Sequence, residues 1–296
     1  MQTDPTIMFF DQYQRYHTAA DLIRKIKTLL THSEGEPDGS IAVSATDKTG
    51  TGKTGNTMRI LEVGANEHRD LGKELPEDDI FYTDLNLPES MQGDDHCFTA
   101  DATDLKDVGD DAYDVCVALD VFEHVPAEKR ARFLTELYRV CRYGVVISFP
   151  YYASEVEQAE KGVNDMYKDL YGEDHPWLAE HIVNGLPDRE KAEAVLRENG
   201  ISFTSFTHGN LTLWMKLLIL SFFAEEDRFA DAVTEANLYY NRNLYAQDSR
   251  DVDYRVFYVL EKDAALQGKI ADPFADARLM EEMVAPVDRA LQTIIG

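Results

Sequence analysis

Several acidic residues and one glycine stand at the ends of short apolar runs in the first half of the chain. Gly64 directly follows one such run, Asp84 ends the next, and Asp101 and Asp120 end two more. A glycine lets the backbone approach a ligand closely, and a carboxylate at the end of the following strand can accept hydrogen bonds from both ribose hydroxyls. The spacing therefore predicts a nucleoside-binding site.

Parallel strands would bring these residues together. Apolar runs alternate with helical patterns over the first half of the sequence, which is typical of an α/β fold whose parallel sheet is covered on both faces. The expected strands lie near 59–63, 80–84, 97–101, 113–120 and 144–150. Ligands of such sheets lie beyond the carboxyl ends of the strands, where all four residues fall.

The motifs LEVGAN, FYTDLN, ADATDL and YDVCVALDVFEHVP occur in this order within residues 59–152. In this region the sequence resembles a class I S-adenosylmethionine-dependent methyltransferase. The resemblance implies a Rossmann-like seven-stranded sheet with an antiparallel last strand, plus helical insertions that form a lid. It departs from the family at Asn66 and His68, which replace two glycines of the first turn, and at 142–144, where Arg-Tyr-Gly replaces Pro-Gly-Gly.

The family also implies which residues hold the cofactor, S-adenosylmethionine, and its product, S-adenosylhomocysteine. Glu62 would lie near the amino group, Asp84 would bind the ribose, and Asp101 with the Ala102 amide would contact the adenine. Two of these carboxylates have a plainer alternative, because Glu62 could cap its own loop and Asp101 could cap a helix. The complete expected set is Glu62, Gly64, Ala65, Asn66, Asp84, Leu85, Asp101, Ala102 and Leu119.

Two residues after the fourth strand are candidates for catalysis. His124 is the expected general base, because a neutral imidazole can accept a proton near pH 7. Asp120 would face the methyl-transfer site. Alternatively, His124 packs or forms hydrogen bonds beside the cofactor without any role in proton transfer.

Aromatic and histidine side chains in the segment after the fifth strand are candidates for substrate binding. They are Tyr151, Tyr152, His175, Trp177 and His181. Plain packing within the lid is the alternative for Trp177, and a role in fixing a loop is the alternative for the histidines. The spacing of the two histidines matches no metal-binding pattern, so no metal is expected.

Composition limits the classes of partner. The net charge is −26, from 29 basic and 55 acidic side chains. Such a field repels phosphate backbones, so a small-molecule acceptor is expected and nucleic acid is not. No apolar run is long enough to span a bilayer, and three scattered cysteines imply no disulfide framework, so the expected location is the cytoplasm. The sequence does not indicate an oligomeric state.

The predicted organisation places this core between helical segments. Residues 32–57 read as a linker, and within them TGTGKT imitates a phosphate-binding loop but lacks its first glycine and the following helix. The expected parts are an N-terminal helix at 1–31, the linker at 32–57, a cofactor-binding core at 58–150, a lid insertion at 151–187, a core helix and strand at 188–207, a second helical insertion at 208–250, and the last strand with a C-terminal helix at 251–296.

The sequence thus favours a methyltransferase that acts on a small or saccharide-like acceptor at oxygen. A weaker resemblance at 175–188 is to bacterial methyltransferases that accompany surface-polysaccharide glycosyltransferases. One alternative is an NAD(P)-dependent oxidoreductase on a related sheet, although its fuller glycine turn is absent. Another is a methyltransferase-like module that only binds a partner.

Overall fold

The computed structural model describes residues 8–33 and 57–295, and the expected linker with its TGTGKT sequence lies almost entirely outside them. The strands are β1 (Arg59–Val63), β2 (Asp79–Asp84), β3 (Cys97–Thr99), β4 (Tyr113–Leu119), β5 (Cys141–Pro150), β6 (Phe203–Asn210) and β7 (Asp253–Glu261). The helices are α1 (Phe10–Ser33), α2 (Asp70–Glu74), α3 (Arg130–Val140), α4 (Ser154–Tyr171), α5 (Pro176–Asn184), α6 (Arg189–Glu198), α7 (Leu211–Ser221), α8 (Ala230–Tyr239) and α9 (Glu281–Ile295).

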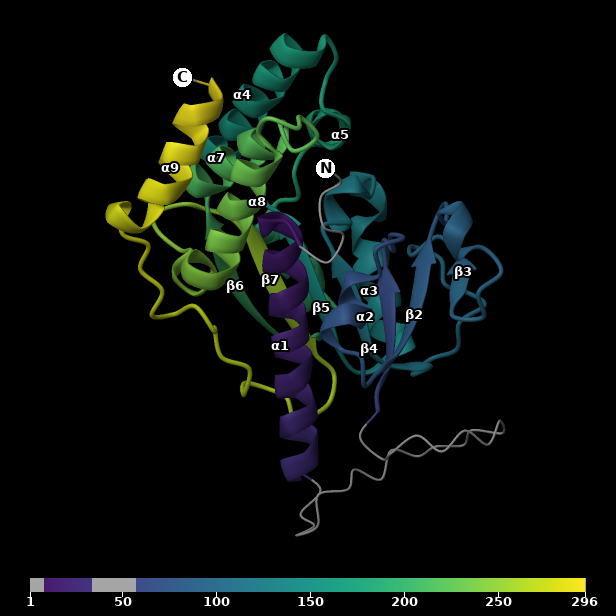
Figure 1. Ribbon diagram of the computed structural model, residues 1–296. Helices are drawn as coiled ribbons and strands as arrows, with labels where there is room; N and C mark the ends of the chain where they lie inside the picture. Colours follow the sequence, from purple (N-terminus) through teal and green to yellow (C-terminus); the bar gives the residue numbers. More distant parts are fainter. Residues whose placement is uncertain (1–7, 34–56, 296) are drawn as a thin grey trace.

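The strands form one sheet in the order β3-β2-β1-β4-β5-β7-β6 (Figure 1). The first five strands are parallel, and β7 is antiparallel to both of its neighbours. This confirms the predicted Rossmann-like sheet with an antiparallel last strand. The chain order reverses between β1 and β4, and ligands of open α/β sheets bind at such a switch point.

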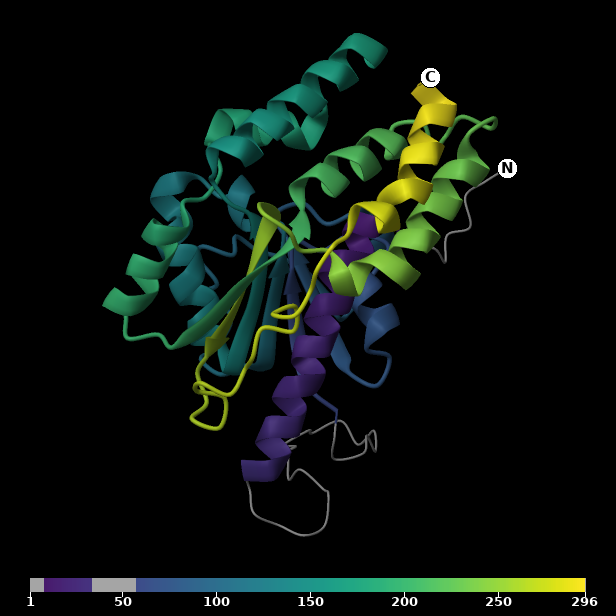
Figure 2. The same cartoon turned by 90° about the vertical axis from the view of Figure 1, so that its left-hand side faces the viewer.

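Both faces of the sheet are buried, which explains the continuous apolar runs. Along β4, Val115 and Val117 join the core on one face, whereas Cys116 and Ala118 join the core on the other. This alternation follows from the two-residue period of a strand. The sheet lies between α1 with α2 on one side and α3 with α6 on the other (Figure 2).

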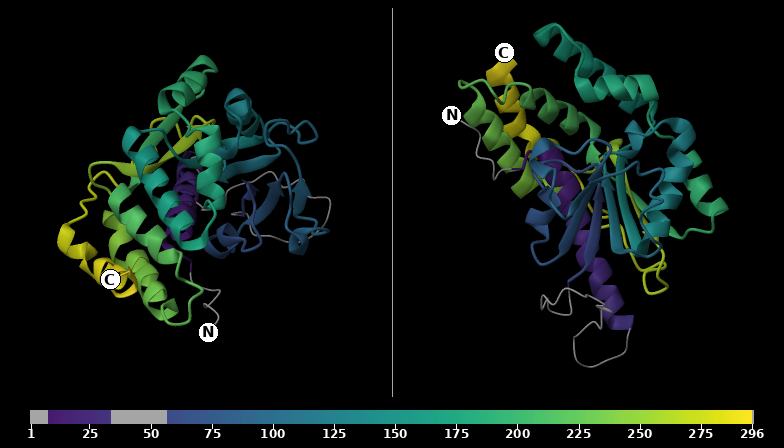
Figure 3. Two further views of the ribbon diagram at one scale, coloured as in Figure 1. Left: turned by 90° about the horizontal axis from the view of Figure 1, so that it is seen from above. Right: turned by 90° about the vertical axis from the view of Figure 1, so that its right-hand side faces the viewer.

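Two helical insertions lie at one end of the sheet. One consists of α4 and α5 and follows β5, and the other begins with α7 directly after β6. Because β5 and β6 are both antiparallel to β7, they end at the same edge as the other parallel strands. The view from above shows the insertion helices over this edge (Figure 3).

The structure defines the element boundaries in the second half of the chain. The closing helix begins only at Glu281, because Phe274, Ala277 and Leu279 are buried in a non-helical strap whose apolar spacing resembles that of a helix. The sixth strand runs to Asn210, which pairs with Asp253 of β7. Helix α7 ends at Ser221, and α8 follows as a separate helix.

Candidate active site

Gly64 forms the turn between β1 and the first helical segment. Its φ is +81°, and a Cβ atom there would lie 2.2 Å from Cγ2 of Val121. The Gly64 and Ala65 amides both donate to the carbonyl of Thr83, at 3.0 and 3.3 Å. The turn therefore needs glycine both for its backbone conformation and for the close approach of the neighbouring chain.

Glu62 is buried at the end of β1 in a hydrogen-bonded chain with α1. The Tyr16 hydroxyl donates to Glu62 Oε1 at 3.0 Å and accepts from the Asn66 side-chain amide at 2.9 Å. Glu62 Oε2 is buried without a partner. Burial raises the pKa of Glu62 to about 8. An unpaired carboxylate oxygen at this place suits the cationic amino group of a cofactor.

The two other predicted carboxylates lie at the same edge of the sheet. Asp84 ends β2 and is partly exposed, and its Oδ1 accepts from the Asn86 amide at 2.9 Å. Asp101 Oδ1 accepts from the Thr103 amide and hydroxyl, which lower the pKa of Asp101. The structure thus shows the turn-capping contact for Asp101, while its Oδ2 contacts Lys129 at 3.3 Å. Leu85 is exposed, whereas Ala102 and Leu119 are buried.

Asp120 follows β4 with a φ of +53° and is held between two arginines. Arg255 Nη2, from β7, donates to its Oδ2 at 2.5 Å, and Arg15 Nε lies 3.6 Å from the same oxygen. The Ser148 hydroxyl donates to its Oδ1 at 3.0 Å. Both carboxylate oxygens are thus engaged, one by the Ser148 hydroxyl and the other by the arginines, and the catalytic role of Asp120 stays a prediction.

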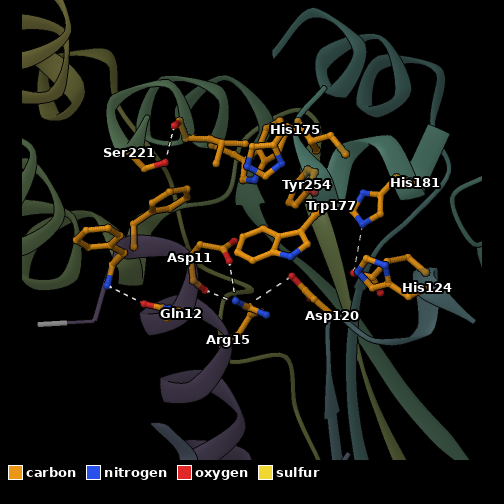
Figure 4. Close-up of a pocket in the computed structure, with 16 residues that line it drawn as sticks. Asp11, Gln12, Arg15, Asp120, His124, His175, Trp177, His181, Ser221 and Tyr254 are labelled. Atoms are coloured by element: carbon orange, nitrogen blue, oxygen red, sulfur yellow. Dashed lines mark hydrogen bonds and ion pairs between the residues drawn. The ribbon is translucent and has the colours of Figure 1, made fainter. Parts of the chain in front are cut away.

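A cavity of about 240 Å³ opens beside Asp120 (Figure 4). Helix α1 contributes Asp11 and Arg15 to one end, and α5 contributes Trp177 and His181 from above. Much of the remaining wall is apolar. The lining residues include Phe10, Glu123, His124, His175, Leu178, Trp214, Leu218 and Tyr254.

His124 lies on this wall in a 3₁₀ turn, Phe122–His124, that follows β4. Its Nδ1 lies 2.6 Å from Oε2 of Glu180 in α5, and its ring centroid is 5.0 Å from that of His181. Burial lowers the pKa of His124 below its ordinary value, so the imidazole is neutral near pH 7. A neutral imidazole whose Nδ1 is held by a carboxylate presents Nε2 as a proton acceptor.

The five expected substrate-binding residues divide into two groups. His175, Trp177 and His181 line the cavity. Tyr151 and Tyr152 do not belong to that lining: Tyr151 packs against the Arg189 guanidinium, and Tyr152 is exposed. The pair of tyrosines in the sequence did not reveal these positions, because they depend on the packing after β5.

Sequence reasoning missed several lining residues. Glu123 was adjacent to His124 in the motif but was not singled out. Asp11 and Arg15 come from the N-terminal helix, where no site residue was predicted. Trp214 stacks on Tyr254 with ring centroids 3.9 Å apart. These residues lie far apart in the sequence, and only the packing of α1, α7 and β7 around one cavity brings them together.

The chain is similar to several known proteins. Residues 54–149 match the family model of a methyltransferase domain. No curated protein matches the sequence. A SAM-dependent methyltransferase from Archaeoglobus fulgidus is 14% identical with a TM-score of 0.44, over 83% of this chain and 94% of that one. The phosphoethanolamine N-methyltransferase 2 of Haemonchus contortus, in complex with S-adenosylhomocysteine, is 12% identical with a TM-score of 0.43, over 87% and 60%.

The family match spans the first five strands, and the sheet has the strand order and antiparallel β7 expected for this family. Residues 54–149 therefore form a methyltransferase domain within a Rossmann-like sheet, and the cofactor of this domain is S-adenosylmethionine. The glycine turn and the unpaired Glu62 oxygen fit this cofactor. Within the described residues, no helix combines the length and apolar character needed to cross a membrane.

Proposed function

We propose that this methyltransferase acts on a small acceptor, held in the cavity beside Asp120, and methylates it at oxygen. The observation that carries the proposal is the position of this cavity. It opens at the carboxyl end of β4, beside the edge where Gly64 and Asp84 lie, and is roofed by α5. An acceptor there would lie next to a cofactor bound at that edge.

In this proposal the expected residues hold the cofactor at the ends of β1, β2 and β4. Glu62 binds the amino group, and Asp84 accepts hydrogen bonds from the ribose hydroxyls. Gly64 lets the backbone pass close to the cofactor. When bound, S-adenosylmethionine supplies a methyl group on a positively charged sulfur. Alignment of the acceptor and exclusion of water are then the main tasks of the protein.

The lining suggests the class of acceptor. Trp177, Trp214 and Tyr254 contribute aromatic side chains to the wall, which also carries charged and imidazole groups. An aromatic wall with a few polar groups suits a small ring that bears hydroxyls, such as a saccharide-like molecule. The excess of acidic side chains favours such an acceptor over a nucleic acid.

His124 is the residue that we propose to take a proton from the acceptor. Glu180 fixes its Nδ1, and Nε2 remains for the acceptor. We also propose that α4 and α5 act as a lid, since α5 supplies three of the residues on the cavity wall, Trp177, Leu178 and His181.

Calorimetry with S-adenosylhomocysteine and NAD tests the class of enzyme. Binding of the former in the micromolar range without binding of NAD is expected, and the reverse would favour the oxidoreductase alternative. Turnover with hydroxylated rings as acceptors separates an enzyme from a module that only binds a partner. His124→Ala should lower turnover roughly 10²-fold or more with little change in cofactor affinity, and unchanged turnover would remove His124 from the reaction.

A further inference from the structure

Three possible metal ligands meet on one wall of the cavity. Glu123 and His124 lie in the 3₁₀ turn after β4, and His181 lies in α5. One ligand atom from each lies within 4.8 Å of the others. The sequence did not indicate this cluster of three ligands, because the third residue comes from the insertion after the next strand. Figure 4 shows the two imidazoles side by side at the cavity.

Two of these ligands carry buried atoms without partners. Glu123 is 1% exposed and its Oε2 accepts no hydrogen bond, and His181 is 6% exposed with no partner at Nε2. His181 Nε2 lies 3.9 Å from Glu123 Oε1, which is too far for a hydrogen bond. Buried polar atoms are nearly always paired, so unpaired atoms that face one another in a cavity indicate a missing ligand.

A carboxylate contacts the Nδ1 atom of each imidazole. Glu160 Oε1 lies 2.9 Å from His181 Nδ1, and Glu180 Oε2 lies 2.6 Å from His124 Nδ1. The Tyr254 hydroxyl also donates to Glu160 Oε1, at 2.8 Å. A histidine whose Nδ1–H donates to a carboxylate presents an unprotonated Nε2, and this arrangement accompanies most histidine ligands of metals.

The other carboxylates around these three residues are already engaged. Glu160 and Glu180 contact the Nδ1 atoms of the imidazoles, and Asp120 is engaged by Arg255 and Arg15. The available donors are therefore two imidazole nitrogens and one carboxylate. Three protein ligands of this kind with an open position are typical of catalytic zinc sites and suit other divalent transition metals as well.

We infer that Glu123, His124 and His181 bind a divalent transition-metal ion whose open coordination position faces the acceptor cavity. An acceptor oxygen would fill that position, and this part of the inference rests on the proposed function. In the metal-bound protein His124 is a ligand, and coordination replaces its action as a base, because a metal-bound hydroxyl loses its proton more readily. The proton would pass to solvent water, and the acceptor oxygen would take the methyl group as its bond to the cofactor sulfur breaks and leaves a neutral thioether.

Metal binding can be measured without any methyl transfer. The tag-free chain, stripped with EDTA, is titrated with Zn²⁺ by calorimetry and with Co²⁺ by absorption spectroscopy. We expect one equivalent to bind, with a visible Co²⁺ spectrum of low coordination number. His181→Ala and His124→Ala should each weaken binding at least tenfold, and Glu160→Gln should weaken it about 10- to 100-fold, because the carboxylate charge behind His181 is lost.

His96→Ala is the matched control, since His96 pairs with Asp79 far from the cavity and should leave metal affinity unchanged. The inference is overturned if the unmodified chain binds neither ion, or if the His96 and His124 variants bind equally well. S-adenosylhomocysteine binding, measured on the same samples, reports folding and the cofactor site. If the unmodified chain binds S-adenosylhomocysteine but no metal, only the metal site is refuted. If the unmodified chain does not bind S-adenosylhomocysteine, the proposed function is refuted.

Discussion

At the scale of single residues, Glu62 links the stability of the protein to pH. Its carboxyl ionises near pH 4.5 when exposed, but burial raises its pKa to about 8 in the folded chain. Between these values the unfolded chain binds fewer protons, so the stabilising contribution of this group is complete below pH 4.5 and is lost as pH rises through 8.

Glu62→Gln removes this dependence. We expect the unmodified chain to lose on the order of 3–4 kcal/mol of unfolding free energy relative to the variant between pH 5 and pH 8. Urea denaturation of both proteins across that range measures the difference. Glu67→Gln is the control, because Glu67 is exposed in the same turn and should show no such trend. A constant difference between the Glu62 variant and the unmodified chain would refute the buried titration.

Asp84 is the residue on which the cofactor assignment depends most directly. Asp84→Ala should weaken S-adenosylhomocysteine binding by about 1.5–3 kcal/mol, since two hydrogen bonds to a charged group are lost. Calorimetry measures the change. Asp95→Ala removes the same charge from an exposed position nearby and should have little effect. Equal affinity of both variants would mean that the ribose does not bind at the end of β2.

At the scale of elements, α5 contributes an exposed aromatic side chain to the wall of the cavity. Trp177 is 65% exposed but lines the cavity, with its ring centroid 5.5 Å from that of His175. An indole with this exposure contributes little to the core and is free to cover a ligand.

Trp177→Ala should therefore raise the acceptor KM about three- to tenfold and change cofactor affinity little, because one aromatic contact is lost. Steady-state kinetics with varied acceptor measures the effect. Val183→Ala truncates another exposed apolar side chain on α5 and should leave KM unchanged. A fall in turnover without a change in KM would contradict a role of Trp177 in binding.

At the scale of the whole molecule, the net charge of −26 opposes compaction. Raising KCl from about 0.1 to 1 M shortens the screening length from about 10 to about 3 Å, which should raise the unfolding free energy by roughly 1–2 kcal/mol. Urea denaturation in a KCl series measures this. Screening predicts that most of the gain comes at the lower concentrations, so a strictly linear gain would point to salt effects on apolar surface instead.

The sequence predicted the parts of the fold that depend on local patterns. Continuous apolar runs identified the strands of the parallel core, and the order of motifs identified the sheet and its cofactor edge. Local pattern failed where tertiary packing overrides it. The strap before α9 has helix-like spacing, yet its apolar residues are buried without forming a helix.

The sequence by itself determined the class of sheet and the kind of residue at each strand end, because strand and turn propensities act over a few neighbouring residues. Only the tertiary structure decided which side chains meet at the cavity. In the folded chain Asp120 pairs with Arg255, and His181 lies beside Glu123 and His124. Tyr151 and Tyr152 lie outside the cavity lining. These contacts join segments far apart in the chain, and their geometry arises only when the insertion helices pack over the edge of the sheet.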